Sequence, residues 1–279
     1  VLKTVPLYPY DPEIQEDPNP RGNSRGGKGI LISGEELYVG TYHSIPVYDL
    51  DLNLKRKITN HLFVNIHEMC FAGEDIWVSS TAIDAAVLVD RRGNTLKTWW
   101  PREEPLLREK FGLYPMEIDK SADNRLKHIH PELSTKEHHT HLNGVIKSGD
   151  RTYVLLNKLG VVARVEPGVK IAVEDEAIRG AHSPKITRDG RQLILCSSFK
   201  KEVLFYDLEK GTLDKRIPLP DFVEIARLQE ENPDQPYNRS IFVRGLEIID
   251  EQRILVGISP ASILEIDMER GRLLDIYRY

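Results

Sequence analysis

Histidines are the residues of this chain whose type and spacing best suit chemistry. The stretch "EHHTHLNGV" holds His138, His139 and His141 directly before an apolar run. His67 and His182 also stand at the head of apolar, strand-like runs, 74 residues before and 41 residues after His141. Neutral imidazoles bind Zn, Fe(II) or Mn, and they exchange protons near neutral pH. The histidines can share such chemistry only if the fold brings these distant residues together.

The elements that must position the histidines form a repeated pattern of short strands. Five segments each hold four runs rich in β-branched, leucine and aromatic residues, with Gly- and Asp-containing turns at matching places. The segments begin at Lys28, His67, His141, His182 and Arg244. A repeated four-stranded meander of about 40 residues is typical of a β-propeller blade. We therefore expect an all-β fold, a five-bladed β-propeller of four-stranded antiparallel blades that forms a single domain over residues 1–279.

Three stretches fall outside the repeat. Residues 1–26 are rich in proline and predict an extended N-terminal arm. Residues 101–139 and 219–243 lack the strand pattern, and we interpret them as loop and helix insertions that cover one face of the propeller as lids.

Each insertion contains one expected helix. In "PREEPLLREKFG", Pro101 or Pro105 can begin a short helix with Leu106, Leu107 and Phe111 on one face. In "DFVEIARLQE", Asp221 is placed to cap a second helix of one or two turns.

The repeat predicts where the candidate site lies. In a propeller the first strand of each blade is innermost, so its first residue sits at the mouth of the central channel. We therefore expect the first residues of the five segments to form one ring, together with the loops between the second and third strands. Those loops carry Tyr42, His43 and Asn157. Loops held by a rigid scaffold are the usual place for a small-molecule site.

The chemistry of this ring follows from its charges. Five cations or potential cations at one mouth would repel one another, so either the histidines are neutral and bind a metal, or an anionic ligand or a neighbouring carboxylate balances them. In the metal hypothesis, His67, His141 and His182 bind a divalent Fe, Zn or Mn ion and leave coordination positions open for catalysis. Arg244 and Lys28 would then hold an anionic group of a small substrate.

Other candidate roles complete this hypothesis. The candidate catalytic residues are His43 or His139 as acid or base and Arg244 beside the substrate. Tyr42, Asn157 and Phe111 are candidates to line the substrate site. We place His138 and His139, which precede the strand, in the lid or in solvent. His128 and His130 of "KHIHPEL" are expected in an exposed loop, or lining the lid.

Several functions remain open on this evidence. The first is a metal-dependent lyase or hydrolase acting on a small, polar, anionic molecule. An Fe(II) oxygenase could use the same three histidines, and a histidine-based group transferase would need no metal. A non-catalytic binding propeller that recognises an anion or a peptide is the alternative from another class. A further interpretation gives the histidines no role in function, so that they only satisfy backbone groups at blade junctions.

Composition limits the partners. The formal net charge of -5 offers no basic stripe for nucleic acid, and no apolar run approaches the roughly 20 residues that span a bilayer. Cys70 and Cys196 lie in strand-like runs and are expected to be reduced core residues. No secretory signal is visible, so we expect a cytoplasmic protein with a small-molecule substrate, and the sequence leaves its oligomeric state open.

Four short motifs carry a family resemblance. "HEM" at 67, "HLNGV" at 141, "HSPK" at 182 and "FVRGLEII" at 242 resemble, in this order, the signatures of a mostly bacterial β-propeller family without an established reaction. The resemblance covers about residues 60 to 260 and implies a propeller in which His67, His141, His182 and Arg244 form one set. More distantly, the chain is similar to virginiamycin B lyase and SMP-30 type propellers, which implies metal and catalytic groups at the channel mouth. The insertion at 101–139 departs from both groups.

Overall fold

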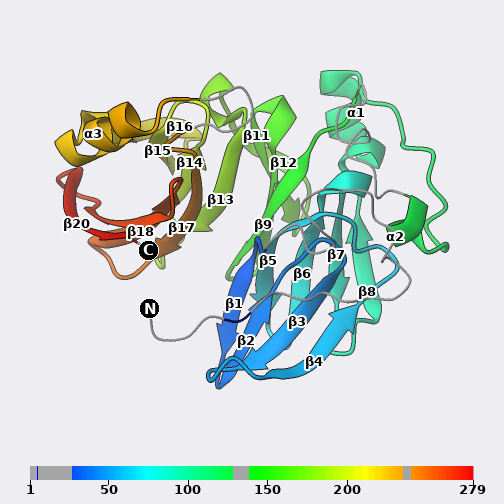
Figure 1. Ribbon diagram of the computed structural model, residues 1–279. Coiled ribbons are helices and arrows are strands. Elements are labelled where there is room, and N and C mark those ends of the chain that lie inside the picture. Colours follow the sequence, from blue (N-terminus) through cyan, green and yellow to red (C-terminus); the bar gives the residue numbers. More distant parts are fainter. Residues whose placement is uncertain (1–4, 6–26, 128–137, 235–239, 279) are drawn as a thin grey trace. The chain divides into compact units, whose positions relative to one another are not determined.

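The computed structural model describes residues 5, 27–127, 138–234 and 240–278. Its strands form five four-stranded sheets, and the strands of each sheet lie side by side in chain order (Figure 1). They are the blades of a five-bladed β-propeller, as the repeat predicted. The predicted N-terminal arm falls on residues outside the described ranges, apart from residue 5, and so do His128 and His130.

The five sheets follow the predicted segments. Their strands are β1 (Ile30–Ser33), β2 (Glu36–Val39), β3 (Ser44–Asp49) and β4 (Leu54–Thr59); β5 (Ile66–Ala72), β6 (Asp75–Ser80), β7 (Ala85–Val89) and β8 (Thr95–Trp99); β9 (Leu142–Ser148), β10 (Arg151–Leu156), β11 (Val161–Glu166) and β12 (Lys170–Glu174); β13 (Ala181–Ile186), β14 (Gln192–Ser197), β15 (Glu202–Asp207) and β16 (Thr212–Pro218); and β17 (Val243–Ile248), β18 (Arg253–Ile258), β19 (Ser262–Asp267) and β20 (Arg272–Arg278).

The chain divides into two compact units. Residues 1–147, 152–156 and 165–169 make up the first unit, and residues 148–151, 157–164 and 170–279 make up the second. The first two sheets therefore belong to the first unit and the last two to the second. The single-domain organisation stays a prediction.

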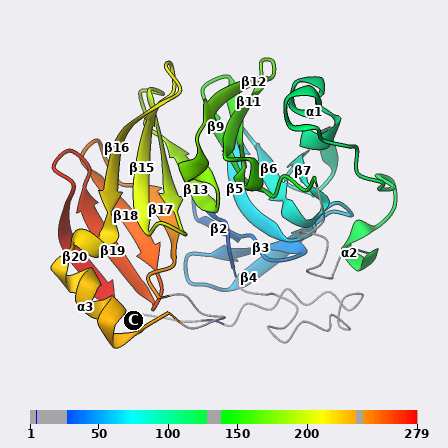
Figure 2. The same ribbon diagram turned by 90° about the horizontal axis from the view of Figure 1, so that it is seen from above.

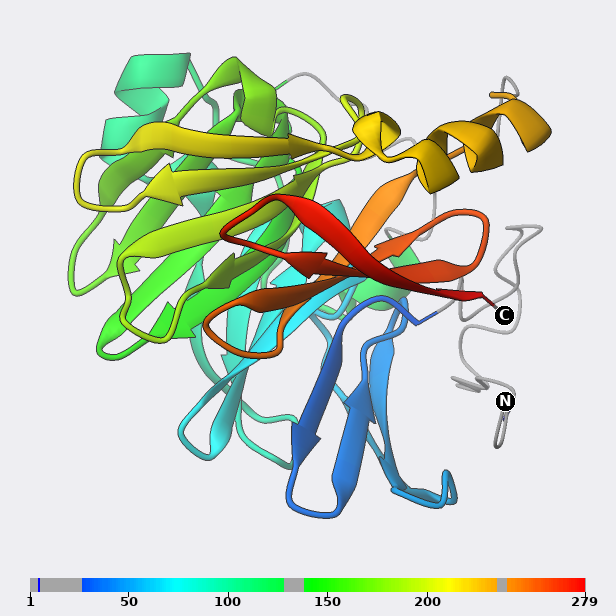
Figure 3. The same ribbon diagram turned by 90° about the vertical axis from the view of Figure 1, so that its left-hand side faces the viewer.

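Each unit has its own hydrophobic core. In the first unit, buried aliphatic and aromatic side chains of β3, β5, β6 and β7, among them Ile45, Met69 and Val78, pack into one cluster. In the second unit, β14, β15, β17, β18 and β19 supply the corresponding cluster, and β13 and β17 lie next to each other (Figure 2). β20, drawn in red in Figure 3, is the outer edge of the last sheet. The strand interiors are rich in β-branched and aromatic residues, which suit a pleated surface that is buried on one or both faces.

The two insertions contain the helices. Helix α1 (Pro105–Phe111) begins with a proline at its first position and ends at Gly112 in the left-handed conformation. Leu107 is fully buried but Leu106 is 40% exposed, so the prediction that both lie on one face was wrong. Successive helical residues point about 100° apart, and only one of the two can face the core. A short helix α2 (Asn124–Lys127) follows.

Helix α3 (Val223–Glu231) lies in the second insertion and packs Ile225 and Leu228 into the core of the second unit. The N-cap of α3 is Phe222, which makes no side-chain cap hydrogen bond. Asp221 lies one residue before the N-cap, at the end of a 3-10 turn (Leu219–Asp221). The prediction that Asp221 caps this helix was therefore wrong. No helix within the described ranges has the length and apolar character needed to cross a membrane.

Both cysteines are free, as predicted. Cys70 lies in β5 and is half-buried, and Cys196 lies in β14 and is fully buried.

Candidate active site

The predicted ring residues all stand at the starts of first strands. His67, His182 and Arg244 are the second residues of β5, β13 and β17, His141 directly precedes β9, and Lys28 lies two residues before β1. In three of these strands the pairing with the next strand is interrupted at or beside the candidate residue. The register shifts between Ile66 and Met69, between His182 and Lys185, and between Val243 and Gly245. Such bulges re-aim side chains and are frequent beside active sites.

Backbone strain gathers at the same places. Eight non-glycine residues of the described ranges have positive φ, and five of them lie within three positions of a ring residue. They are Asn65, His138, His141, Ser183 and Ile241, with φ values of 60°, 62°, 55°, 48° and 53°. The left-handed region is unfavourable for L-residues, most of all for β-branched ones such as isoleucine. Strain of this kind persists where the surrounding structure imposes it, and it clusters at functional sites.

In the first unit, His67 and His141 lie side by side. Their ring centroids are 5.5 Å apart and the rings are inclined by 75°. The Lys28 ammonium is bound to the side-chain oxygen of Asn65 and lies 5.8 Å from the centroid of the Tyr42 ring. Three of the predicted residues, Lys28, His67 and His141, are thus linked through direct or shared contacts in one unit.

The tautomer of His67 follows from its hydrogen bond. Its Nδ1 lies 3.0 Å from the main-chain oxygen of Asn65. A carbonyl oxygen can only accept, so Nδ1 carries the proton, and in the neutral ring Nε2 carries the lone pair. Metal-bound histidines commonly have this arrangement, in which the other ring nitrogen donates to a protein oxygen.

A 3-10 turn, Thr81–Ile83, fixes the segment that carries His139 and His141. Thr81 Oγ1 donates to the Leu142 oxygen at 2.7 Å, and the fully buried Asp84 that ends the turn accepts from Thr140 N at 2.8 Å and from Leu142 N at 3.0 Å. Both neighbours of His141 are therefore anchored to one turn of the preceding blade.

His139 is bound into this same structure. Its Nδ1 accepts a hydrogen bond from the His141 main-chain N–H at 3.0 Å, which leaves the proton on Nε2, 3.4 Å from the Ala82 oxygen. The His139 ring is 3% exposed, so the expectation that it lies in the lid or in solvent was wrong: its hydrogen bonds to the backbone bury it. Both ring nitrogens face backbone groups, which suits a residue that shapes the loop. A role for His139 as acid or base stays a prediction.

In the second unit, His182 and Arg244 share a neighbour. The Phe242 ring centroid lies 5.8 Å from that of His182 and 5.7 Å from the Arg244 guanidinium carbon. His182 Nδ1 lies 2.8 Å from Ser198 Oγ, and that hydroxyl donates to the Val243 oxygen. Because the serine has one proton to give, His182 must donate through Nδ1, and its Nε2 carries the lone pair as in His67.

The loop residues proposed to line the site are largely buried. Asn157 holds the residues just before His182, because its amide nitrogen donates to the Ala181 oxygen at 2.8 Å and its oxygen accepts from Gly180 N at 3.2 Å. Tyr42 and His43 are 3% and 1% exposed, and their rings contact each other with centroids 4.5 Å apart. The substrate contacts of Tyr42 and Asn157, and a catalytic role for His43, stay predictions.

Phe111 and Tyr114 lie in the first insertion, which was predicted to form a lid. Phe111 ends α1 and is half-buried, with the Lys110 ammonium 5.7 Å from its ring centroid. Tyr114, farther along this insertion, is exposed, and its ring contacts that of His138. A role for Phe111 in substrate choice stays a prediction.

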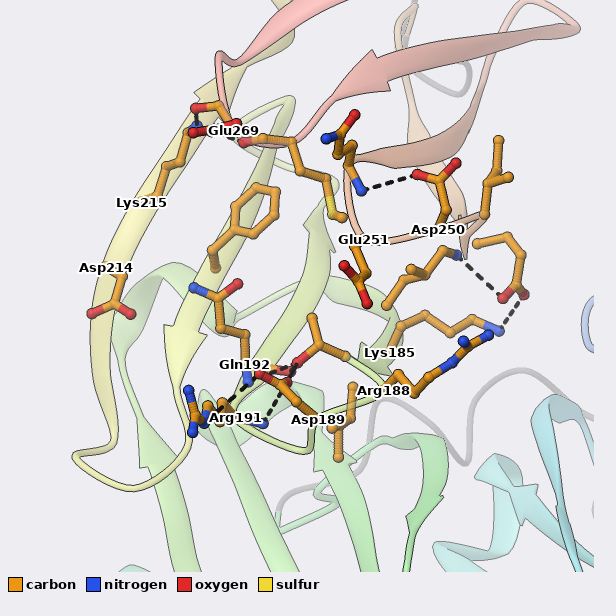
Figure 4. A pocket seen from close by; sticks show the side chains of 18 of the residues that line it. Lys185, Arg188, Asp189, Arg191, Gln192, Asp214, Lys215, Asp250, Glu251 and Glu269 are labelled. Atoms are coloured by element: carbon orange, nitrogen blue, oxygen red, sulfur yellow. Dashed lines mark hydrogen bonds and ion pairs between the residues drawn. The ribbon is translucent and has the colours of Figure 1, made fainter.

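A large open cavity lies elsewhere in the second unit. It has a volume of about 1350 Å³ and is lined by residues around the turn after β13 and the turn after β17, at the opposite ends of these strands from His182 and Arg244 (Figure 4). Seven acidic and four basic side chains line it, and no histidine is among its described lining residues.

Both lysines that line this cavity are engaged by neighbouring groups. Lys185 binds Glu247 at 2.8 Å, and Lys215 donates to the main-chain oxygens of Met268 and Glu269 at 2.6 Å each. None of the predicted ring residues lines this cavity, and we place the candidate site at the strand starts.

Metal-ligand geometry is incomplete in the structure. Across residues 27–127, 138–234 and 240–278, no three His, Cys, Asp or Glu side chains gather as a group able to hold a metal ion. The chemistry of the donors still fits a divalent metal in part. Two imidazoles on one tetrahedral metal, with metal–nitrogen bonds of about 2.1 Å, have ring centroids about 5 Å apart, close to the 5.5 Å between His67 and His141.

Three residues of this site were missed by the sequence reasoning: Asn65, Asp84 and Phe242. Asn65 and Asp84 carried a usable signal, since asparagine and aspartate are enriched in the left-handed region and each stands beside a predicted strand start or loop. Phe242 carried none, because a phenylalanine before a strand is most often a core residue.

Comparison with known proteins supports the fold. No protein-family model matches the chain, and no curated protein matches it in sequence. Among solved structures, a streptogramin B lyase has a TM-score of 0.54 and 11% sequence identity, over 91% of this chain and 69% of the lyase.

Two further structures are similar. Virginiamycin B lyase from Staphylococcus aureus, as its selenomethionine form, has a TM-score of 0.50 and 10% identity over 91% of this chain and 70% of that protein. The WD40 β-propeller domain of Doa1 has a TM-score of 0.55 and 8% identity over 92% and 69%. The expected likeness to virginiamycin B lyase is confirmed at the level of fold, and the chain has the β-propeller architecture that lyase and WD40 proteins share.

Proposed function

We propose that this protein is a metal-dependent enzyme of the lyase or hydrolase type that acts on a small, polar, anionic molecule at the site of Lys28, His67 and His141. The observation that carries the proposal is the pair of imidazoles 5.5 Å apart, one of which donates Nδ1–H to a protein oxygen and so carries its lone pair on Nε2. The lyase neighbours are consistent with it.

Each residue of this site would have its own role in the proposed reaction. His67 and His141 would hold a divalent Fe, Zn or Mn ion, which supplies polarisation of a substrate oxygen or a lowered pKa for a bound water. Lys28 would bind the anionic group of the substrate as a point charge. His182 has the same Nδ1-donor arrangement as His67, and the prediction that it completes the metal set, with Arg244 on the substrate, stays a prediction because both belong to the other unit. The same donor set would serve an Fe(II) oxygenase.

A binding propeller without catalysis is the second candidate. It is favoured by the lack of a three-ligand metal group among the described residues and by the full engagement of His139 with backbone groups. In that case Lys28 and the histidines would recognise an anion or an acidic peptide by charge and hydrogen bonding alone.

Metal analysis separates the two. The untagged protein is purified and its metal content is measured by mass spectrometry, followed by calorimetric titration of the stripped protein with Zn²⁺ and Mn²⁺. We expect stoichiometric binding, weakened at least about tenfold in His67→Ala and in His141→Ala.

His61→Ala is the matched control, because that histidine contacts the Lys120 oxygen outside the site and its loss should leave metal binding unchanged. Unaltered metal affinity in both site variants, or no binding by the wild type, would leave the binding propeller as the function.

A further inference from the structure

Asn65 lies at the centre of the contacts that join Lys28 to His67. Its side-chain oxygen accepts from the Lys28 ammonium, and its main-chain oxygen accepts from His67 Nδ1 at 3.0 Å. One residue therefore contacts both the predicted anion-binding cation and a predicted metal ligand.

The backbone of Asn65 is held by two neighbouring loops. Its N–H donates to the Tyr42 oxygen at 2.7 Å, and its oxygen also accepts from Thr81 N at 3.2 Å. Its φ of 60° turns the carbonyl toward the His67 ring two residues later. Asparagine tolerates this conformation better than most residues, and alone among the tolerant types it adds a neutral amide oxygen.

Lys28 is fixed from its other end as well. Its N–H donates to the Gly40 oxygen at 2.9 Å, and Gly40 N donates back to Gly29 at 2.7 Å. The long side chain then runs past the Tyr42 ring to Asn65. Asn65 is a neutral acceptor and so does not itself neutralise the ammonium, whereas a carboxylate at the same position would.

We propose that Asn65 is the positioning residue of this site: it holds the Lys28 charge and the His67 ring together so that a substrate's phosphate or carboxylate group binds at Lys28 while the atom beside it meets His67. This inference rests on the proposed function. It narrows the substrate class to molecules whose anionic group is adjacent to the reacting atom.

Two substitutions separate positioning from simple support of the fold. Asn65→Gly keeps the left-handed backbone and the carbonyl but removes the oxygen that holds Lys28. Asn65→Asp keeps the acceptor, adds a negative charge opposite the ammonium and leaves the fold's contacts intact. Asn53→Gly is the matched control, since Asn53 binds Asp49 in an exposed hairpin of the same unit.

The probe is inorganic phosphate, titrated into the full chain and followed by calorimetry, with thermal unfolding measured on every variant. We expect phosphate to bind the wild type and the Asn53→Gly control equally. Affinity should fall about three- to tenfold in Asn65→Gly, because the lysine loses its fixed rotamer. It should fall more than tenfold in Asn65→Asp without a drop in melting temperature, a result that a purely structural role would not produce.

The His67 ring gives an independent readout. Long-range ¹H–¹⁵N spectra of the histidine rings should show the Nδ1–H tautomer of His67 in the wild type and in Asn65→Gly, which retains the carbonyl. An Nε2–H tautomer in the wild type overturns the inference, as does unchanged phosphate affinity in both Asn65 variants. If the wild type does not bind metal, the proposed function is overturned. The phosphate titration then still tests, separately, whether Asn65 positions Lys28 for an anion.

Discussion

The buried carboxylate of Asp84 provides the sharpest test of how the site is held. It is 1% exposed and accepts three hydrogen bonds, from Thr140 N at 2.8 Å, Thr140 Oγ1 at 2.7 Å and Leu142 N at 3.0 Å. These bonds bracket His141 on both sides. Removal of the carboxylate charge should therefore lower the stability of the fold and loosen His141 together.

The expected loss of stability follows from which carboxylate oxygen of Asp84 accepts each hydrogen bond. In Asp84→Asn the retained oxygen can keep Thr140 Oγ1 and Leu142 N, which both bind Oδ1, while the new amide group meets the Thr140 N–H that bound Oδ2. One buried donor is left unpaired, and the other two bonds lose their charge assistance. We expect a loss of about 2–3 kcal/mol in the free energy of unfolding. The backbone adds no penalty, because asparagine accepts the φ of 58° found at this position.

Urea unfolding followed by far-ultraviolet circular dichroism measures this loss. Asp90→Asn is the control, since Asp90 also accepts from several neighbours, Asn94 among them, but in an exposed hairpin, and a change within about 1 kcal/mol is expected there. Metal affinity should fall in Asp84→Asn and stay constant in Asp90→Asn. If the free energy of unfolding of Asp84→Asn is within about 0.5 kcal/mol of the wild-type value, the hydrogen bonds of Asp84 do not hold His141 in place.

Two predictions concern the scaffold of the first unit. The Arg56 guanidinium, and after it Lys55, lowers the pKa of Glu36 below its ordinary value, so the ionised form is stabilised by folding. In urea unfolding at pH 7, the free energy of unfolding of the wild type should exceed that of Glu36→Gln by about 1 kcal/mol. This difference should shrink as the pH falls below the unfolded pKa of about 4.3 and vanish once acid protonates the folded carboxylate. A difference that grows in acid contradicts this. A Cβ at Gly93 would lie 2.3 Å from the Thr59 oxygen, whereas one at Gly34 meets nothing within 4 Å. Gly93→Ala should cost about 3 kcal/mol and Gly34→Ala about 1 kcal/mol in urea unfolding, and equal losses would refute the packing argument.

The strand pattern made the architecture predictable. Hairpin turns recur at matching positions, and two strands joined by such a turn pair with each other in chain order. The blade boundaries therefore follow from the sequence. The same register placed His67, His182 and Arg244 correctly at strand starts. Helix α1 was also visible, because proline at a first helical position and glycine after the last are direct signals.

The finer structure of the site was beyond the sequence. Which way the His67 ring donates depends on the carbonyl of Asn65, and a carbonyl direction is set by φ and ψ, which no residue type fixes alone. The bulge after Ile66 likewise depends on the pairing of two strands. His139 was predicted to be a candidate acid or base from its position in a cluster, but its hydrogen bonds to the backbone became apparent only from the fold.

A single turn connects the two histidines that lie together. Thr81 donates through its N–H to the Asn65 oxygen, which also binds His67, and through its hydroxyl to Leu142, which follows His141. His67 and His141 belong to different blades, so nothing in the geometry of either sheet alone fixes the distance between them. The turn after β6 supplies that link, because it touches the supports of both residues and ends in Asp84. The separation of the two imidazoles is therefore set by a loop whose side chains need never touch substrate, and changes in that loop should alter metal affinity before they alter the fold of either blade.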